Sequence, residues 1–302
     1  MKKKYKVISL YCFTKIEKIL ILEIKEKLLA YKNNVSGLII LGEEGINGTI
    51  CGPEEYIDKL FEFIKEFSKK NDLNEKISFY DKKIFKKLKV KIKAEIVTIG
   101  IKDINPESQN GAYLDAREWN DVIEDKNTII IDTRNHYEVK LGTFKNAINP
   151  NTNNFREFPK WVEKNLEKTI KNKKKHKIAM FCTGGIRCEK ATSFLKRKGF
   201  ENVFHLKGGI LKYLETVEPD KNLYIGECYV FDERVALDNQ LKKGNYSICY
   251  ACGMPVSEKD KNKIEYIEGI QCHNCINKFT EQDRKRFAER QKQYCKEEKL
   301  FK

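Results

Sequence analysis

The chain has 302 residues, with 59 Lys and Arg against 44 Asp and Glu, and a formal net charge of +15. This length predicts two or three domains, and 40% hydrophobic with 34% charged residues excludes a disordered or a membrane-embedded chain. No stretch approaches the roughly 18 uninterrupted apolar residues that a membrane helix needs. The positive charge has two competing explanations, a folded surface for nucleic acid and the lysine-rich composition typical of an A/T-rich genome. We favour the nucleic-acid partner.

The N-terminus resembles a signal peptide only weakly. Three lysines precede a short apolar run, no small-residue cleavage site follows, and charged residues come directly after it. We therefore interpret residues 5–13 as a first strand and expect a cytoplasmic protein. In that compartment the ten cysteines are expected to be thiols, metal ligands or catalytic groups rather than a disulfide framework.

Residues 1–105 are predicted to form a ferredoxin-like α+β domain. The order of the predicted elements is strand, helix, two strands joined by a Gly-rich turn, helix and strand. Thr14 is expected to cap the first helix, which runs to about Tyr31, and Pro53 is expected to open the second. The predicted strands span residues 5–13, 38–41, 46–51 and 76–80.

A further strand is expected at residues 88–92, where apolar side chains alternate with lysines. Lys89, Lys91 and Lys93 share one face. A row of lysines is suited to the phosphate backbone of a nucleic acid. Lysines also protect a solvent-exposed edge strand from aggregation. Both interpretations are open at this point.

Residues 110–219 are predicted to form an α/β domain with a largely parallel sheet, after a loop at 102–109 that contains Pro106. The strands are expected at 128–132, 178–181 and 203–205. The helices are expected at 155–166 and 186–198, with another beginning at 210. Residues 220–302 are predicted to be an irregular, cysteine-bearing segment that closes with a charged helix from Thr280 to about residue 299.

Cys182 carries the strongest chemical signal in the chain. It is expected to stand at the end of a buried strand, followed by Gly184, Gly185 and a helix. Ligands bind in the crevice beyond the carboxyl ends of such strands, and paired glycines allow successive N–H groups to point inward. These N–H groups, the helix N-terminus and Arg187 would favour a thiolate. The alternative is a buried, inert cysteine, which would need neither the glycines nor the arginine.

The segment from Cys182 to Arg187 resembles the active-site loop of rhodanese-like domains, whose cysteine carries a persulfide. Three further segments match in the expected order: Asp132-Thr133-Arg134, residues 142–150 with Thr143 in place of the usual His, and residues 206–210 with their Gly-Gly pair. Related dual-specificity phosphatases use Cys-x5-Arg to hold a larger phosphate. The Cys-x4-Arg spacing here therefore disfavours a phosphatase.

Four segments resemble those of a narrower family, the oxygen-dependent tRNA uridine hydroxylases, and the resemblance extends over nearly the whole chain. They are residues 45–52, 149–152, 155–159 and 182–191. The resemblance implies conversion of the tRNA wobble uridine to 5-hydroxyuridine, with molecular oxygen as co-substrate. No nucleotide-binding or flavin motif is present, and no obligate protein partner is evident.

The same resemblance implies roles for individual residues. Cys182 would be catalytic, and Arg187 with the backbone of the intervening loop would stabilise its anionic or persulfide form. Asp132, Arg134 and Glu138 would brace the loop. Cys188 could be a resolving thiol, but a helical core position favours a structural role. The intervening loop residues are Thr183, Gly184, Gly185 and Ile186.

Two other functions remain open from the residues alone. A persulfide on Cys182 could pass sulfur to tRNA or to a small acceptor, which would make the protein a sulfurtransferase. An RNA-binding adaptor with a degenerate rhodanese fold is a third interpretation, but the intact Cys182 argues against it.

The C-terminal segment holds two Cys-x2-Cys pairs separated by nineteen residues. The spacing predicts a tetrahedral zinc site that would hold together a segment too short and polar to fold alone. Redox-active dithiols and unliganded cysteines are the alternatives. The four candidate ligands are Cys249, Cys252, Cys272 and Cys275. Of the remaining cysteines, Cys295 is expected to be exposed, whereas Cys12, Cys51 and Cys228 are expected to fill the core.

Overall fold

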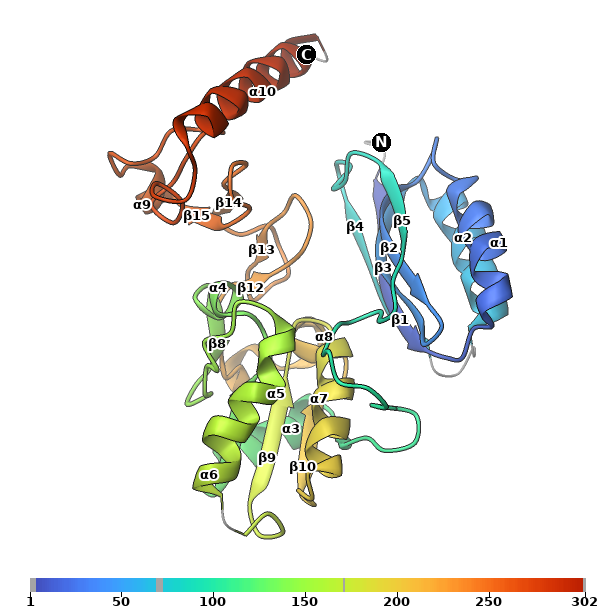
Figure 1. Cartoon of the computed structure of the whole chain (residues 1–302), viewed down its shortest axis with the longest axis vertical. Helices are drawn as coiled ribbons and strands as arrows, with labels where there is room; N and C mark the ends of the chain where they lie inside the picture. The colour runs from blue at the N-terminus through green and yellow to red at the C-terminus, as the bar shows by residue number, and fades with distance from the viewer. Residues whose placement is uncertain (1–3, 69–72, 171, 301–302) are drawn as a thin grey trace. The chain divides into compact units, whose positions relative to one another are not determined.

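The computed structural model describes residues 4–68, 73–170 and 172–300, with side chains to residue 293 (Figure 1). The prediction for Cys295 therefore lies outside the described side chains. The chain divides into two compact units, Met1–Gly226 and Glu227–Lys302. No helix of the described residues is both long enough and apolar enough to span a bilayer.

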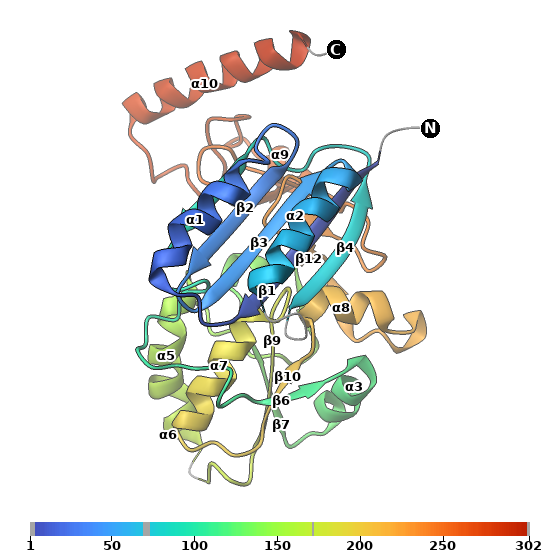
Figure 2. The same cartoon turned by 90° about the vertical axis from the view of Figure 1, so that its right-hand side faces the viewer.

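The first unit begins with a five-stranded sheet in the order β4-β1-β3-β2-β5, which confirms the ferredoxin-like prediction. Strand β1 pairs antiparallel with β3 and β4, while β5 pairs parallel with β2. Two helices cover one face of this sheet, and the aliphatic core lies between them and the strands (Figures 1 and 2). The elements are β1 (Tyr5–Phe13), α1 (Lys18–Leu29), β2 (Ser36–Gly42), β3 (Gly45–Gly52), α2 (Glu54–Phe67), β4 (Asn74–Tyr80) and β5 (Leu88–Ile92).

The predicted helix cap at Thr14 is wrong, because α1 begins four residues later. Its N-cap is Glu17, whose side chain makes no capping hydrogen bond. The backbone N–H groups of Thr14 and Ile16 donate instead to Glu44 and Glu43 in the β2–β3 turn, both at 3.0 Å. The chain after β1 therefore stays extended against that turn, and these tertiary hydrogen bonds override the local capping preference of threonine.

The segment between the two sheets packs against the second domain. Ile99 is buried in the core that holds β9 and α7, and Val97, Ile101 and Ile104 pack against the same core. The Arg197 guanidinium donates to the Lys102 carbonyl at 2.8 Å. This segment is thus part of the first compact unit rather than a free linker.

The second domain contains a parallel sheet in the order β6-β10-β9-β7. Its strands are β6 (Ala112–Leu114), β7 (Thr128–Asp132), β9 (Lys177–Phe181) and β10 (Val203–Leu206), with a separate pair β8 (Gly142–Phe144) and β11 (Tyr224–Gly226). Its α-helices are α3 (Ala116–Glu124), α4 (His136–Val139), α5 (Phe158–Trp161), α6 (Glu167–Thr169), α7 (Ile186–Arg197) and α8 (Gly209–Thr216).

The segment predicted as one helix at 155–166 is instead a succession of three short helical forms. A 3₁₀ turn at Phe155–Glu157 leads into α5, and a π-helical stretch at Val162–Leu166 follows. Its buried residues Phe155, Phe158 and Val162 still face the domain core.

The second unit has little regular structure apart from its last helix. Thr280 and Asp283 form a reciprocal cap at the start of that helix, with hydrogen bonds of 3.1 and 3.2 Å. The predicted start is therefore confirmed. The elements are β12 (Cys228–Tyr229), β13 (Ala236–Leu237), β14 (Tyr246–Ile248), β15 (Pro255–Ser257), α9 (Glu258–Lys261) and α10 (Glu281–Leu300).

Candidate functional site

Cys182 follows the last residue of β9, and the loop after it curls around its sulfur. The Gly185 N–H donates to Cys182 Sγ at 3.1 Å. Gly185 has φ +99°, which an L side chain rarely adopts, and helix α7 begins at the next residue. The glycine that the sequence places here is therefore required by the turn that aims the N–H at the thiol.

Helix α8 holds the loop from the other side. The N–H groups of Ile210 and Leu211 donate to the carbonyls of Cys182 and Thr183 at 2.9 and 3.1 Å. A Cβ on Gly209 would lie only 2.5 Å from the Cys182 carbonyl oxygen, so no larger residue fits without displacing the loop. Gly209 is thus required by the close approach of two backbones, whereas Gly208 has φ +69° and a Cβ there would meet only the Lys212 side chain.

The surroundings of Cys182 favour its thiolate. Burial raises the pKa of this thiol, but a hydrogen bond from Cys188, the charge of Arg187 and the N–H groups of Arg187 and Cys188 outweigh burial. The pKa falls to about 6. Cys188 shows the opposite effect, because burial and its hydrogen bond to Cys182 raise the pKa of its own thiol well above the usual range. The two thiols therefore act as donor and acceptor, with the charge on Cys182.

Arg187 is held beside the thiol by Glu138. Two hydrogen bonds of 2.7 and 2.8 Å join the guanidinium to both carboxylate oxygens, and the Glu138 side chain is fully buried. Burial is the largest single effect and opposes ionisation of Glu138, but the charge and hydrogen bonds of Arg187, the charge of Arg134 and the Asn135 N–H together outweigh burial and lower the pKa of this carboxyl. Thr183 also reaches Glu138, at 3.5 Å. Loop residues Gly184 and Ile186 are half-buried, and the space beside the Gly184 Cα is open.

Asp132 and Arg134 form a second buried ion pair at the end of β7. Arg134 Nε and Nη2 donate to the two Asp132 oxygens at 2.9 and 2.6 Å, and Arg134 also reaches the Gly142 carbonyl at 2.5 Å. Thr143, which stands where rhodanese-like domains usually have His, donates to Asp132 at 2.9 Å. The structure therefore brings the loop residues and the bracing residues together in one region of the second domain.

Alkylation of Cys182 is expected to follow its lowered pKa. Because only the thiolate reacts, the rate of carbamidomethylation should rise through a midpoint near pH 6, whereas an ordinary cysteine has a midpoint near pH 8.5. Mass spectrometry of the tryptic peptide that contains Cys182, after short iodoacetamide pulses at different pH values, measures this midpoint. A midpoint above pH 8 would contradict the thiolate assignment.

Sequence reasoning missed several residues of the first domain that contact the helix after the loop. Tyr11 Oη donates to Glu189 Oε1 at 2.9 Å, and Lys190 Nζ pairs with Glu44 and Glu95 at 2.8 and 2.7 Å. Glu189 and Lys190 lie within the motif at residues 182–191. No local pattern identifies their partners, which lie 95 to 178 residues away.

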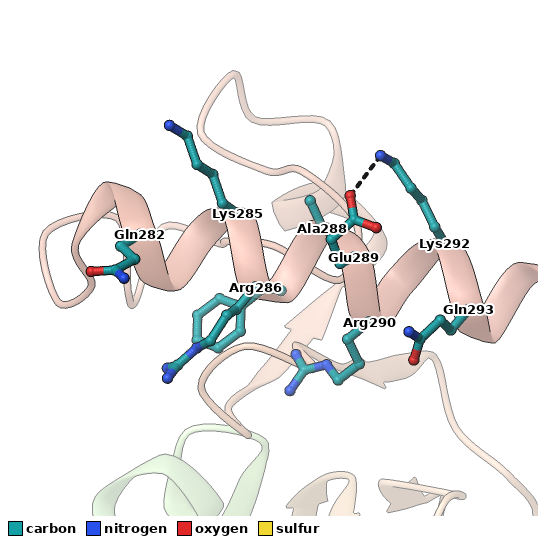
Figure 3. Close-up of a pocket in the computed structure, with 9 residues that line it drawn as sticks. Gln282, Lys285, Arg286, Ala288, Glu289, Arg290, Lys292 and Gln293 are labelled. Carbon is teal, nitrogen blue, oxygen red and sulfur yellow. Dashed lines mark hydrogen bonds and ion pairs between the residues drawn. The ribbon is translucent and has the colours of Figure 1, made fainter.

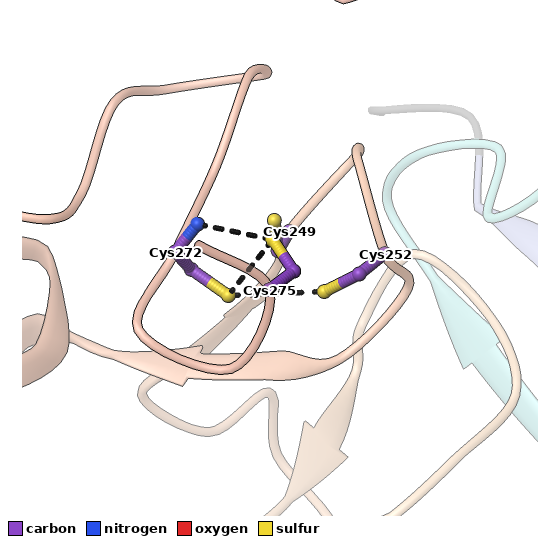
Figure 4. Close-up of side chains that lie close together, drawn as sticks. All are labelled: Cys249, Cys252, Cys272 and Cys275. Atoms are coloured by element: carbon purple, nitrogen blue, oxygen red, sulfur yellow. Dashed lines mark hydrogen bonds between the residues drawn. The ribbon is translucent and has the colours of Figure 1, made fainter. Parts of the chain in front are cut away.

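The four predicted metal ligands come together in the second unit. Cys249 and Cys252 come from one loop and Cys272 and Cys275 from another, and all four sulfurs lie within 4.8 Å of one another (Figure 4). The Cys272 N–H also donates to Cys275 Sγ at 3.3 Å. Four converging thiols provide the donor set of a structural zinc site.

Helix α10 is fastened to the loops that carry these thiols. Arg290 donates to the Tyr250 carbonyl at 2.6 Å, and Arg284 donates to carbonyls of Ile276 and Phe279 just after the second pair. Side chains of α10 alone line an open hollow of about 900 Å³ (Figure 3). This hollow contains no cysteine, so it offers none of the chemistry found in the loop or the cluster.

The three predicted lysines lie at strand β5, on the side of the first sheet opposite its two helices. Leu88 and Val90 enter the core beneath the helices, so Lys89 and Lys91 point to the opposite face, and Lys93 follows the strand. All three are exposed. Strand β5 is an edge strand, so the structure is compatible with both interpretations of the lysine row.

Comparison with known proteins defines the class first. Residues 5–96 match the UPF0176 acylphosphatase like domain, and residues 115–216 match the Rhodanese-like domain. The chain is thus a rhodanese-domain protein with an acylphosphatase-like N-terminal domain. A solved rhodanese-related protein from Thermoplasma volcanium is similar over 36% of this chain and 95% of its own, with 24% identity and a TM-score of 0.29.

Whole-length relatives are more specific. A tRNA uridine(34) hydroxylase of Prochlorococcus marinus strain MIT 9515 is 59% identical over 297 residues, which cover 98% of this chain and 96% of the relative. One from strain MIT 9312 is 58% identical over 293 residues, covering 96% and 94%. The chain belongs to the tRNA uridine(34) hydroxylase family, which confirms the resemblance noted from its motifs.

Proposed function

We propose that this protein hydroxylates the wobble uridine of tRNA to 5-hydroxyuridine in the cytoplasm, with molecular oxygen as co-substrate and Cys182 as the catalytic residue. The observation that carries the proposal is the Cys182 thiol, which accepts a backbone N–H at 3.1 Å and has a pKa of about 6. The tRNA uridine(34) hydroxylases to which the chain is similar over 98% of its length support the substrate.

The surrounding residues have distinct parts in this proposal. Thr183, Gly184, Gly185 and Ile186 form the backbone cradle, Arg187 balances the thiolate or persulfide charge, and Glu138 orients Arg187. Asp132 and Arg134 hold the end of β7 against the loop. We propose three functional parts with boundaries at 1–105, 110–219 and 220–302: a tRNA-facing domain, a catalytic domain and a metal-bearing segment.

The test is mass spectrometry of tRNA nucleosides from cells with and without the gene. Loss of 5-hydroxyuridine-derived nucleosides on deletion, and their return with the wild-type gene, is expected. Loss of a thiolated nucleoside instead would favour the sulfurtransferase. If no nucleoside changes, both tRNA-modifying functions are contradicted.

We propose that the tRNA contacts the exposed edge of the first sheet at strand β5, through Lys89, Lys91 and Lys93. The preceding β4–β5 connection adds exposed lysines beside them, and Asp81 is the one acidic residue of segment 81–93. Edge protection alone would not require this density of charge. The added lysines are Lys82, Lys83, Lys86 and Lys87.

A Lys89→Ala/Lys91→Ala variant is expected to bind tRNA about tenfold more weakly. The slope of log affinity against log salt concentration should also become less steep by about 1.4 to 1.8, because two phosphate contacts are lost. Fluorescence anisotropy with labelled tRNA at several salt concentrations measures both quantities. The matched control is Lys27→Ala/Lys59→Ala, which removes the same charge from the helix-covered face. Equal weakening by both variants would contradict a localised surface.

We propose that the four-cysteine cluster binds a structural zinc ion. Tetrahedral zinc with bonds of about 2.3 Å separates its sulfurs by about 3.8 Å. The Cys252–Cys272 and Cys272–Cys275 sulfur distances are 3.7 and 3.8 Å, which fit that geometry. The ion would link two loops that have few apolar contacts of their own.

Purified protein is expected to contain one zinc per chain by elemental mass spectrometry, and Cys272→Ser should lose it. Because the metal would stabilise the second unit, the same variant should expose residues 227–302 to trypsin. Cys228→Ser changes a buried thiol of that unit outside the cluster and should retain zinc and protection. A zinc-free wild type with unchanged protease resistance would contradict the proposal.

A further inference from the structure

Two neighbouring charges of helix α7 are buried against the first domain. Glu189 and Lys190 have exposed fractions of 3% and 1%. They occupy the first two turns of the helix whose N-terminal N–H groups face Cys182. Most buried charges need a partner to remain ionised, and these two find partners on different elements of the first domain.

Lys190 is neutralised by carboxylates from two segments. Its ammonium group pairs with Glu44 in the β2–β3 turn and with Glu95 after β5. Glu44 also accepts the Ile96 N–H, and Glu95 accepts the N–H groups of Ile99 and Gly100. The ammonium group therefore joins α7 to the first sheet and to the segment that follows it.

Glu189 is bound differently, because its hydrogen-bond donors are neutral. Tyr11 donates to one oxygen at 2.9 Å, while Tyr113 at 2.8 Å and Asn110 donate to the other. Burial raises the pKa of this carboxyl against the effect of those donors, and the negative charge of Cys182 raises it further. Two negative groups, the carboxylate and the thiolate, thus influence each other within one buried region.

Tyr11 joins this carboxylate to the loop itself. A Cβ on Gly185 would lie 2.8 Å from Tyr11 Oη, so the hydroxyl rests against the residue whose N–H binds the sulfur. Tyr113 donates to the same carboxylate from β6, on the catalytic-domain side. Both tyrosines therefore hold the carboxylate, and Tyr11 also rests against the loop at Gly185.

We propose that Tyr11 and Glu189 are positioning residues through which the first domain sets the ionisation and geometry of the Cys182 loop. The inference rests on the proposed role of Cys182 as the reactive thiol. The first domain would then be part of the active site as well as a surface for RNA. The charged and titratable groups around the thiol and this carboxylate are Arg187, Glu138, Cys188, Arg134, Asp132, Tyr11, Tyr113 and Lys190 with its partners Glu44 and Glu95.

The first test is the pH profile of Cys182 alkylation in Glu189→Gln. This variant keeps the side-chain shape and removes one negative charge, so the alkylation midpoint should fall by about half a pH unit. A purely structural role for Glu189 would leave the midpoint unchanged. An unchanged midpoint in a variant that melts at the wild-type temperature would overturn the proposal.

The second test compares Tyr11→Phe with Tyr56→Phe, which removes a half-buried tyrosine hydroxyl from helix α2 of the same domain. We expect Tyr11→Phe to lower kcat for tRNA hydroxylation about tenfold without changing KM, and Tyr56→Phe to stay within about twofold of wild type. Combining Tyr11→Phe with Glu189→Gln should cost less than the sum of the single effects, because the two side chains act together. The proposed role of Tyr11 would be overturned if both tyrosine variants lost the same amount of kcat. It would also be overturned if the effects of Tyr11→Phe and Glu189→Gln on kcat were additive.

Alkylation reports on the thiol without any turnover. A shifted midpoint in Glu189→Gln together with a wild-type protein that hydroxylates no tRNA would contradict the proposed function and leave the positioning role intact. Conversely, a wild-type protein that hydroxylates tRNA, together with an unchanged alkylation midpoint in Glu189→Gln, would support the proposed function and contradict the positioning role.

Discussion

Replacing Cys182 with alanine is expected to reduce hydroxylation of the wobble uridine by about a thousandfold or more, because it removes the reactive sulfur itself. The side chain is 1% exposed and makes its contacts within the loop, so the loss of stability should be only about 1 kcal/mol. Mass spectrometry of tRNA nucleosides measures the activity, and thermal unfolding of the same preparation measures the stability.

The matched control is Cys51→Ala, which removes a fully buried thiol from the first sheet. It should have a similar small effect on stability and should retain activity. If Cys182→Ala hydroxylates tRNA as well as Cys51→Ala does, Cys182 is not catalytic. A folded, inactive Cys182→Ala beside an active Cys51→Ala is the outcome that supports the mechanism.

The second large effect is expected for Arg187→Met. Removal of the guanidinium leaves the Glu138 carboxylate buried without its bidentate partner, and breaking a buried pair in this way costs about 3–5 kcal/mol. The pKa of Cys182 should also rise, since a nearby positive charge is lost. A thiol of pKa about 6 is about nine-tenths ionised at pH 7, so any rise toward the ordinary value removes most of the thiolate.

The double variant Arg187→Met/Glu138→Gln separates these two consequences. It removes both charges, so it should regain much of the unfolding free energy that Arg187→Met loses. It should not regain the low alkylation midpoint, because the cation is still missing. Urea unfolding and the alkylation profile measure the two quantities. Recovery of both together would show that Arg187 acts on the thiol only through general stability.

The sequence predicted those parts of the candidate sites that lie within one short segment of the chain. The Cys182 loop, from the end of β9 to the start of α7, is one continuous segment, so the types and spacing of its residues predicted its shape. The same is true of each Cys-x2-Cys pair, whose spacing brings two thiols to one turn. Glu138 and Arg187 are 49 residues apart, and the family resemblance was needed to expect both beside the loop.

Long-range contacts were not predictable in this way. Tyr11 lies 178 residues from Glu189, and in the sequence it is one more aromatic residue in a strand. Its side chain faces away from the helices of its own domain, and its hydroxyl finds its partner in the second domain. The predicted helix cap at Thr14 was wrong for a related reason. The backbone N–H of Thr14 donates a hydrogen bond to the β2–β3 turn, which is distant in sequence.

One local signal was missed. Asp115 and Glu118 form a capping box at the start of α3, with the Asp115 side chain accepting the N–H groups of Arg117 and Glu118 at 2.9 and 3.0 Å. An acidic cap three residues before a glutamate is visible in the sequence and predicts a helix start. Recognising it would have placed a helix between the first two strands of the parallel sheet.

The chain between the two domains limits how the enzyme can move. A hinge needs a few exposed residues whose backbone can rotate freely, but here Ile99 is buried in the catalytic domain's core with neighbouring apolar side chains packed beside it. Swinging the first sheet away from the second domain would also leave Glu189 and Lys190, which are 3% and 1% exposed, without their partners Tyr11 and Glu44. In the proposed mechanism, the target uridine would therefore have to leave its stack to reach Cys182, whose side chain is 1% exposed, without the two domains opening on a hinge.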